Sequence, residues 1–280
     1  IKQAVMTHGA VYTSLYMTES SPYYNPTTKA LYYNGGSASN HAVCIVGWND
    51  AYPRTNFLTQ PPGDGAFIIK NSWGSGWGEG GFFYVSYYDA NVGKDNAVFI
   101  SADPTANYDQ VYDYDPLGWV SSLGYGSTTA WFANVFTATS SGELKAVSFY
   151  TASPNSSYQI YVYLDPDSGP LNTSGFATAK IGTIAKMGYH TIALDSSVSL
   201  LAGHRFSVVV RLTTPGYEYP IPFEERYAGY SSGATANPGE SYISPNGSTW
   251  SDITTDYPGS NVCLKAFTTE PEGLLVSPGS

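Results

Sequence analysis

NHAVCIVGWND (residues 40–50) is followed by FIIKNSWGSGWGEGGFFYVSYYD (residues 67–89), and these two stretches decide the fold of the first part of the chain. Each contains a short apolar run with a polar residue at one end, which predicts strands over 41–48 and 66–71. A glycine-rich turn over 74–81 then leads into a third strand over 82–88. The loop between residues 48 and 65 contains PPGDG, so the first two strands are expected to be antiparallel neighbours.

The head of the first strand carries His41, and the tail of the second carries Asn71. A register that pairs position 41 with 71, 43 with 69 and 45 with 67 brings these two side chains together. An amide oxygen that accepts a hydrogen bond from one imidazole nitrogen fixes the tautomer and leaves the other nitrogen free for proton transfer. The pattern therefore predicts the histidine and its orienting residue in a cysteine–histidine–asparagine site.

The two cysteines of the chain are poor candidates for the nucleophile of such a site. Cys44 is three residues from His41, and residues three apart on a strand point to opposite faces. Cys263 lies in the apolar stretch NVCLKAF, far along the chain. Both are expected to be small buried hydrophobic residues, and two cysteines are too few for a disulfide framework.

The two quoted stretches resemble the histidine and asparagine motifs of the papain-like cysteine peptidases, over about residues 1–101. The resemblance implies that His41 and Asn71 are catalytic and that Trp73 shields their hydrogen bond from water. It also implies substrate contacts for Trp77, Asn40, Ser39 and Ser14. Because the last three are small and polar, no strong preference for a bulky apolar substrate side chain is expected.

In that family the nucleophilic cysteine opens a helix, and a glutamine before it completes the oxyanion hole. No segment of this chain resembles QGxCGSCW, and none of its glutamines lies near a cysteine. Residue Ile1 also enters an amphipathic helix, expected over 1–9, without a preceding cap. The partner expected from these observations is an N-terminal peptidase fragment, on a missing or separate chain, that carries the cysteine and glutamine. This chain alone is expected to be inactive.

The composition changes over residues 102–116, where aspartate, tyrosine and proline replace apolar periodicity. The predicted domains are therefore residues 1–105, residues 106–268 and a tail or linker over 269–280. Within the second domain, TWSDI and NVCLKAF resemble the lectin-like β-sandwich attached to some bacterial and archaeal peptidases. The predicted fold class is mostly β, an α+β papain-like second subdomain followed by an all-β sandwich. Its strands are expected at 130–138, 144–151, 158–164, 189–194, 205–212, 240–244 and 261–268.

The formal net charge of −10, with only 12 Lys and Arg in 280 residues, argues against nucleic acid or an anionic membrane as partner. No apolar run reaches the length of a membrane span, and no metal ligands or cofactor motif are evident. The low lysine content suggests a secreted or cell-surface protein. The expected substrate is a protein or peptide, and the sandwich has many aromatic residues that could bind a glycan. The alternative is a non-catalytic binding module that carries an inactive peptidase remnant.

Overall fold

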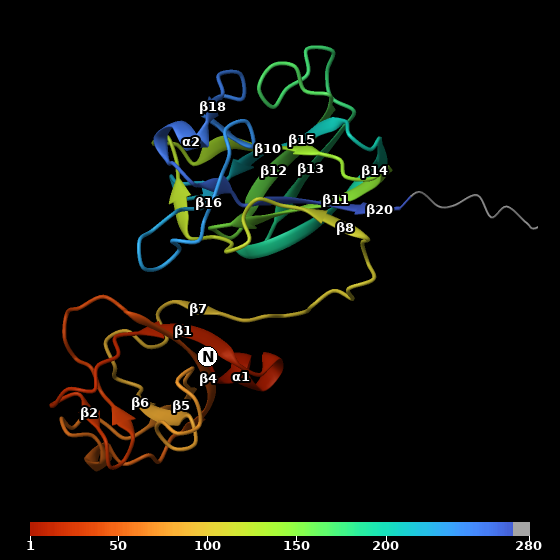
Figure 1. Cartoon of the computed structure of the whole chain (residues 1–280). Coiled ribbons are helices and arrows are strands. Elements are labelled where there is room, and N and C mark those ends of the chain that lie inside the picture. Colours follow the sequence, from red (N-terminus) through yellow and green to blue (C-terminus); the bar gives the residue numbers. More distant parts are fainter. Residues whose placement is uncertain (271–280) are drawn as a thin grey trace, which may run out of the picture. The chain divides into compact units, whose positions relative to one another are not determined.

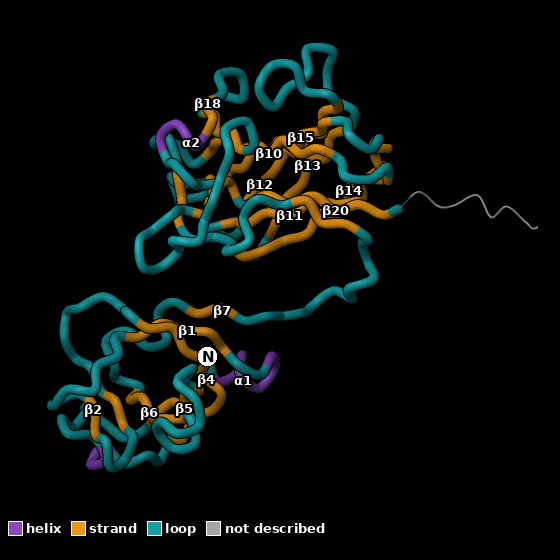
Figure 2. Tube along the Cα trace, in the orientation of Figure 1, coloured by secondary structure: helices purple, strands orange, loops and turns teal. Residues whose placement is uncertain are grey.

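The computed structural model describes residues 1–270, which form two compact units, Ile1–Asp103 and a second that begins at Pro104. The units separate two residues before the predicted boundary at 105/106. Both consist mainly of strands joined by turns and loops (Figure 2), so the fold is mostly β. None of the helices in residues 1–270 has the length and hydropathy that a membrane-spanning segment needs. Most of the predicted tail lies outside the described residues.

The first unit is built on one seven-stranded sheet with the order β2-β3-β6-β5-β4-β1-β7 (Figure 1). The helix α1 (Lys2–His8) precedes it. The strands are β1 (Val11–Leu15), β2 (Tyr24–Asn25), β3 (Ala30–Leu31), β4 (His41–Asn49), β5 (Ala66–Lys70), β6 (Phe82–Ser86) and β7 (Asn96–Ala97), with a 3-10 turn at Arg54–Asn56. The segment between β1 and β4 thus contains two short strands, and β7 is only two residues long.

The central hairpin β4–β5 has a register different from the predicted one. Ile45 pairs with Ile69 rather than with position 67. A bulge between Ile45 and Gly47 shifts the pairing by one further residue in the part of the ladder next to the connecting loop. If the ladder is extended past Lys70, Asn71 falls opposite Val43. The prediction was wrong because it placed His41 directly opposite Asn71, whereas the ladder on the His41 side of the bulge is shifted by two residues from that register. His41 therefore approaches Asn71 diagonally and not from the directly opposite position.

The second unit contains a sandwich of two large sheets and a smaller third sheet. The six-stranded sheet has the order β13-β12-β15-β10-β17-β18, the four-stranded sheet β14-β11-β20-β8, and the three-stranded sheet β19-β16-β9. The bounds are β8 (Gln110–Tyr112), β9 (Ser121–Leu123), β10 (Thr129–Thr137), β11 (Gly142–Thr151), β12 (Ser156–Leu164), β13 (Thr178–Ile184), β14 (Gly188–Leu200), β15 (Arg205–Thr213), β16 (Ile221–Glu224), β17 (Ser241–Ser244), β18 (Ser251–Asp252), α2 (Ile253–Asp256), β19 (Asn261–Val262) and β20 (Leu264–Thr269).

The core of the second unit lies between its two large sheets. Phe132 and Val210 from the six-stranded sheet are fully buried in the same cluster as Phe149 and Leu264 from the four-stranded sheet. Buried side chains alternate with more exposed ones along β12, which is the pattern of a strand with one face toward a core, whereas β10 and β15 are buried over most of their length. The all-β sandwich predicted for this part of the chain is therefore present.

Candidate active site

The site predicted from the sequence centres on His41, the first residue of β4, and Asn71, which follows the last residue of β5. The Nε2 atom of His41 lies 2.8 Å from Oδ1 of Asn71. Asn71 is 4% exposed, and its backbone N–H donates to the carbonyl of Gly81 at 3.0 Å. The strand end and the glycine turn together hold the amide in place beside the imidazole.

The orientation of the Asn71 amide fixes the tautomer of His41. The backbone N–H of Ser72 donates to the same Oδ1 atom at 2.8 Å, and a backbone N–H cannot accept a hydrogen bond. That atom is therefore the amide oxygen, and Nε2 of His41 must donate to it. In the neutral imidazole the Nδ1 atom then has the free lone pair, so it is the atom that can accept a proton.

Two tryptophans of the glycine turn form a wall next to this pair. The ring of Trp73 lies over that of His41 with centroids 4.9 Å apart, and Trp77 meets Trp73 edge to face at 4.9 Å. Trp73 is 45% exposed, so it covers the imidazole from the solvent side. An apolar cover of this kind lowers the local dielectric and strengthens the hydrogen bond beneath it.

Trp77 is also held in place by a hydrogen bond and by packing against the core. Its indole N–H donates to the carboxylate of Glu19 at 2.9 Å, and its ring packs against Tyr24 and Phe83 of the core. The motif alone could not show the Glu19 contact, because the two residues are 58 positions apart. Trp77 therefore has a structural role in addition to the predicted contact with substrate.

The three small polar residues predicted to contact substrate lie together near the head of β4. The hydroxyl of Ser14 donates to that of Ser39 at 3.1 Å. Both polar atoms of the Asn40 side chain are used by the backbone of Met17, at 2.7 and 3.1 Å. Asn40 thus holds the chain after β1 against the segment before β4.

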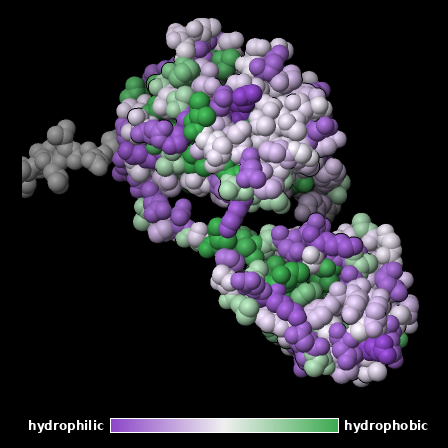
Figure 3. Space-filling model, turned by 180° about the vertical axis from the view of Figure 1, so that it is seen from behind, coloured by the Kyte–Doolittle hydropathy of each residue, from purple (hydrophilic) through white to green (hydrophobic). Residues whose placement is uncertain are grey.

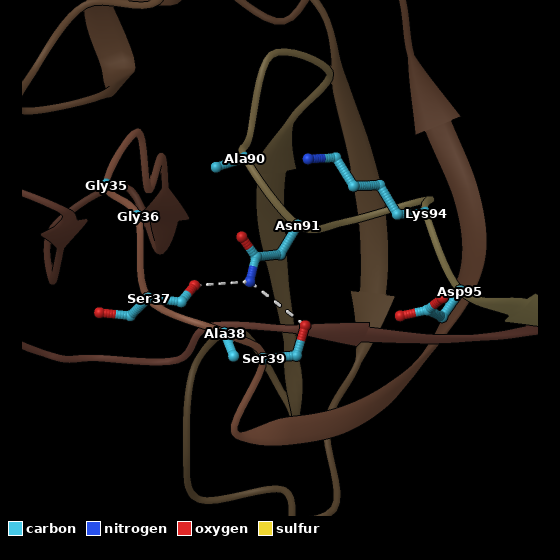
Figure 4. A pocket seen from close by; sticks show the side chains of 9 residues that line it. All are labelled: Gly35, Gly36, Ser37, Ala38, Ser39, Ala90, Asn91, Lys94 and Asp95. Carbon is cyan, nitrogen blue, oxygen red and sulfur yellow. Dashed lines mark hydrogen bonds between the residues drawn. The ribbon is translucent and has the colours of Figure 1, made fainter.

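Ser39 also lines a hollow of about 570 Å³ between two loops of the first unit, residues 35–39 and 90–95 (Figure 4). The amide of Asn91 crosses it and donates to the carbonyl of Ser37 at 3.1 Å and to the hydroxyl of Ser39 at 3.2 Å. The loop over residues 90–95 is fixed by the buried carboxylate of Asp89, whose pKa is raised by burial. The local sequence around Asn91 has no pattern that distinguishes it from a surface asparagine.

The expected burial is confirmed for Cys263 but not for Cys44. On β4, Val43 and Ile45 are buried on the face that begins with His41, whereas Cys44 belongs to the other face and is half-buried. Cys263 is buried in the second unit, and burial raises the pKa of its thiol well above the usual value. Neither presents a thiol to His41. Within residues 1–270, no three side chains of His, Cys, Asp or Glu are grouped so that they could hold a metal ion.

Comparisons with known proteins agree with this division of the chain. Residues 111–268 match the family model of the lectin-like domain, and residues 1–102 match that of the papain family cysteine proteases. A cysteine protease of Blomia tropicalis is 32% identical over 102 residues, which are 35% of this chain and 27% of that protein. The chain therefore spans about a quarter of the length of this relative.

Two solved structures cover almost the whole chain. The cysteine protease Cwp84 after propeptide cleavage, a clostridial protein, matches with a TM-score of 0.75 and 28% identity, over 97% of this chain and 68% of that one. The cysteine protease and lectin-like domains of Cwp84, described as a surface layer associated protein of Clostridium difficile, match with a TM-score of 0.73 and 29% identity, over 97% and 61%. The chain thus belongs to the lectin-like domain family, and its first 102 residues match the papain family of cysteine proteases.

Proposed function

We propose that this chain is part of a cysteine peptidase that hydrolyses peptide bonds, with His41 and Asn71 as two members of its catalytic triad. The observation that carries this proposal is the 2.8 Å contact between the two side chains, beneath the ring of Trp73. The third member, a cysteine thiolate, and the oxyanion glutamine come from a segment outside these 280 residues. Two observations support this: Cys44 is on the face of β4 opposite His41, and Cys263 is buried in the second unit.

The Nδ1 atom of His41 takes up and releases the proton in each half of the reaction. In the resting pair the imidazole has taken the thiol proton, and the thiolate attacks the carbonyl carbon of the peptide. The C–N bond then breaks, and Nδ1–H gives its proton to the departing amine. In the second half, Nδ1 takes a proton from water, the hydroxide attacks the thioester, and the thiolate leaves. Asn71 keeps the imidazole ring in one orientation throughout.

The apolar surface of the first unit favours the binding of a partner segment. Hydrophobic residues gather on one of its faces (Figure 3). Among the large hydrophobic side chains that this unit exposes are Val46, Trp73, Phe99 and Ile100, the last two at 89% and 67%. Exposed apolar patches of this kind mark interaction sites. We propose that the thiol-bearing segment covers part of this surface.

The test uses material that contains this chain together with the thiol-bearing segment. Replacing His41 with alanine should abolish hydrolysis of a peptide substrate, because it removes the imidazole that carries the proton. The matched control is His8→Ala, an exposed histidine at the end of α1 in the same unit, which should keep full activity. Turnover by the His41→Ala variant at the wild-type rate would exclude the proposed mechanism.

We propose a secreted or cell-surface location, in line with the description of Cwp84 as surface layer associated. The alternative function, a binding module with an inactive peptidase part, predicts no thiol-dependent hydrolysis from any preparation. It is separated from the peptidase by the same assay.

A further inference from the structure

The outer face of the six-stranded sheet carries a group of aromatic and polar side chains that the core does not use. Phe132, Ile160 and Val210 point into the core between the sheets. Their chain neighbours Trp131 and Arg211 therefore point to the opposite face, since side chains alternate along a strand. Both are only half-buried. Trp131 packs against the backbone of Gly247 on this outer face and is not part of the core between the sheets.

The aromatic part of this face is a pair of nearly parallel rings. Trp131 and Tyr161 have planes within 19° of each other and centroids 6.1 Å apart. Phe176, which is 53% exposed, meets the edge of Tyr161 at 5.2 Å. The faces of such rings pack against the C–H groups of a sugar ring, and the phenol and indole edges can form hydrogen bonds.

A hollow of about 200 Å³ lies beside these rings on the same sheet. It is lined by the polar side chains of Ser157, Gln159, Thr183, Arg211 and Thr213 and by the apolar side chain of Ile181, which is 68% exposed. Arg211 on β15 lies opposite Trp131 on the neighbouring strand β10 and opposite Gln159 on the other neighbour, β12. The hollow is therefore continuous with the aromatic pair. The volume is below the roughly 300–1,000 Å³ of sites that bury a drug-sized ligand. It suits one unit of a longer ligand that lies across the face.

Arg211 provides the charge of this surface. Its guanidinium lies 5.8 Å from the centroid of the Trp131 ring. Within residues 1–270 it forms no salt bridge and no side-chain hydrogen bond, whereas the nearby Lys180 is paired with Asp195. A guanidinium has five N–H donors in a planar fork that matches a carboxylate. In a chain with 22 acidic and 12 basic residues, an uncommitted arginine in a hollow favours an anionic ligand.

We propose that this surface, formed by Trp131, Tyr161, Gln159 and Arg211, binds an acidic polysaccharide. A sugar ring stacks on the aromatic pair, its carboxylate receives the guanidinium of Arg211, and its hydroxyls meet the Ser, Thr and Gln side chains of the hollow. The ligand class is a uronate-containing glycan, and the site is independent of the peptidase chemistry of the first unit.

The test measures binding of tetragalacturonate to the full chain by calorimetry, with its methyl ester as the uncharged counterpart of the same shape. The wild type should bind the acid more tightly than the ester. Arg211→Gln should weaken binding of the acid by about 10-fold or more and leave the ester unchanged, because only the charge-assisted bonds are lost. Trp131→Ala should weaken both by about 10-fold.

The matched control is Trp119→Ala, which removes another half-exposed tryptophan of the same unit. Trp119 donates to Ser122 and packs near Tyr150, away from the strands of the proposed site. Its replacement should leave binding unchanged. If Trp131→Ala does not fold, quenching of tryptophan fluorescence by the acid, lost in Arg211→Gln, gives a second readout. The proposal is overturned if the wild type does not bind tetragalacturonate, if it prefers the ester, or if Arg211→Gln binds the acid like the wild type.

Discussion

At the scale of single residues, the central feature is a hydrogen bond whose direction is fixed by a neighbour. Ser72 occupies one lone pair of the Asn71 oxygen, so His41 can only donate from Nε2. The sequence predicts that His41 and Asn71 meet, because one lies at the start of a strand and the other at the end of the neighbouring antiparallel strand. It could not predict the tautomer, which depends on a backbone N–H whose direction is set by the turn.

The first prediction concerns Asn71. Replacing it with alanine should lower kcat/KM about 10- to 100-fold, because a hydrogen bond to a group that becomes charged is worth about 1.5–3 kcal/mol. Stability should change less, since the buried Nδ2 atom of Asn71 has no hydrogen-bond partner within residues 1–270. Peptide hydrolysis and thermal melting measure the two effects. Asn49→Ala, which removes an exposed turn contact in the same unit, should alter neither by a comparable amount; equal losses from both variants would contradict the prediction.

The second prediction concerns Asp115, a buried carboxylate of the second unit. Its Oδ2 lies 3.0 Å from the ammonium of Lys265, but burial outweighs this charge and raises the pKa of Asp115 to about 6. The folded state therefore binds a proton that the unfolded chain, with a pKa of 3.8, releases. This favours folding at low pH, and the contribution is lost as the pH rises from about 4 to 6.

Denaturant titrations at several pH values measure this effect. The free energy of unfolding of the wild type should gain about 2 kcal/mol more than that of Asp115→Asn between pH 7 and pH 4.5. Asp113→Asn, which removes the more exposed partner of the same lysine, should keep most of the wild-type dependence on pH, because burial and not the charge of Asp113 is the main cause of the raised pKa of Asp115. An identical pH dependence in Asp115→Asn and the wild type would show that Asp115 does not titrate in this range.

At the scale of elements, the glycine turn between β5 and β6 is the part that positions both tryptophans. Gly78 has a φ of +66°, and a Cβ atom there would lie 2.3 Å from the carbonyl oxygen of Phe82. A backbone atom cannot move away as the end of a side chain can, so only glycine fits. The sequence motif predicted the turn, and the structure gives the reason for this one glycine.

The third prediction follows from this turn. Gly78→Ala should destabilise the first unit by about 1–3 kcal/mol and lower activity, because both a positive φ and a backbone clash oppose the new side chain. The control is Gly76→Ala, where a Cβ atom would meet nothing within 4 Å. Thermal melting of the two variants compares them. Equal stability would show that the turn does not need the conformation described.

The strands of the second unit show where sequence patterns fail. The bounds of long, mostly apolar strands such as β10 and β15 agree with the prediction almost to the residue. The short or edge strands β8, β9, β13, β16 and β18 and the helix α2 were missed. β13 is an edge strand with Ile181 on its surface, and β16 contains a proline, so neither has the pattern of a buried strand. The bulge in β4 likewise has no signature that separates it from regular alternation.

At the scale of the whole molecule, every strand ladder stays within one unit. The fourth prediction is that residues 104–270, expressed alone, fold cooperatively. Their melting temperature should differ from that of the corresponding transition in the full chain by less than about 4 °C, a shift that corresponds to roughly 1 kcal/mol for a domain of this size. Calorimetry of both proteins measures this. An aggregated or unfolded fragment would mean that the second unit depends on the first.

The central claim is that His41 activates a thiol from outside these 280 residues, and labelling with an epoxysuccinyl peptide tests it most directly. Such a probe alkylates an activated cysteine, and peptide mass spectrometry locates the label. In material that contains the thiol-bearing segment, the label should fall on a cysteine outside this chain and disappear in His41→Ala. Labelling of Cys44, or labelling that His41→Ala leaves unchanged, would contradict the account.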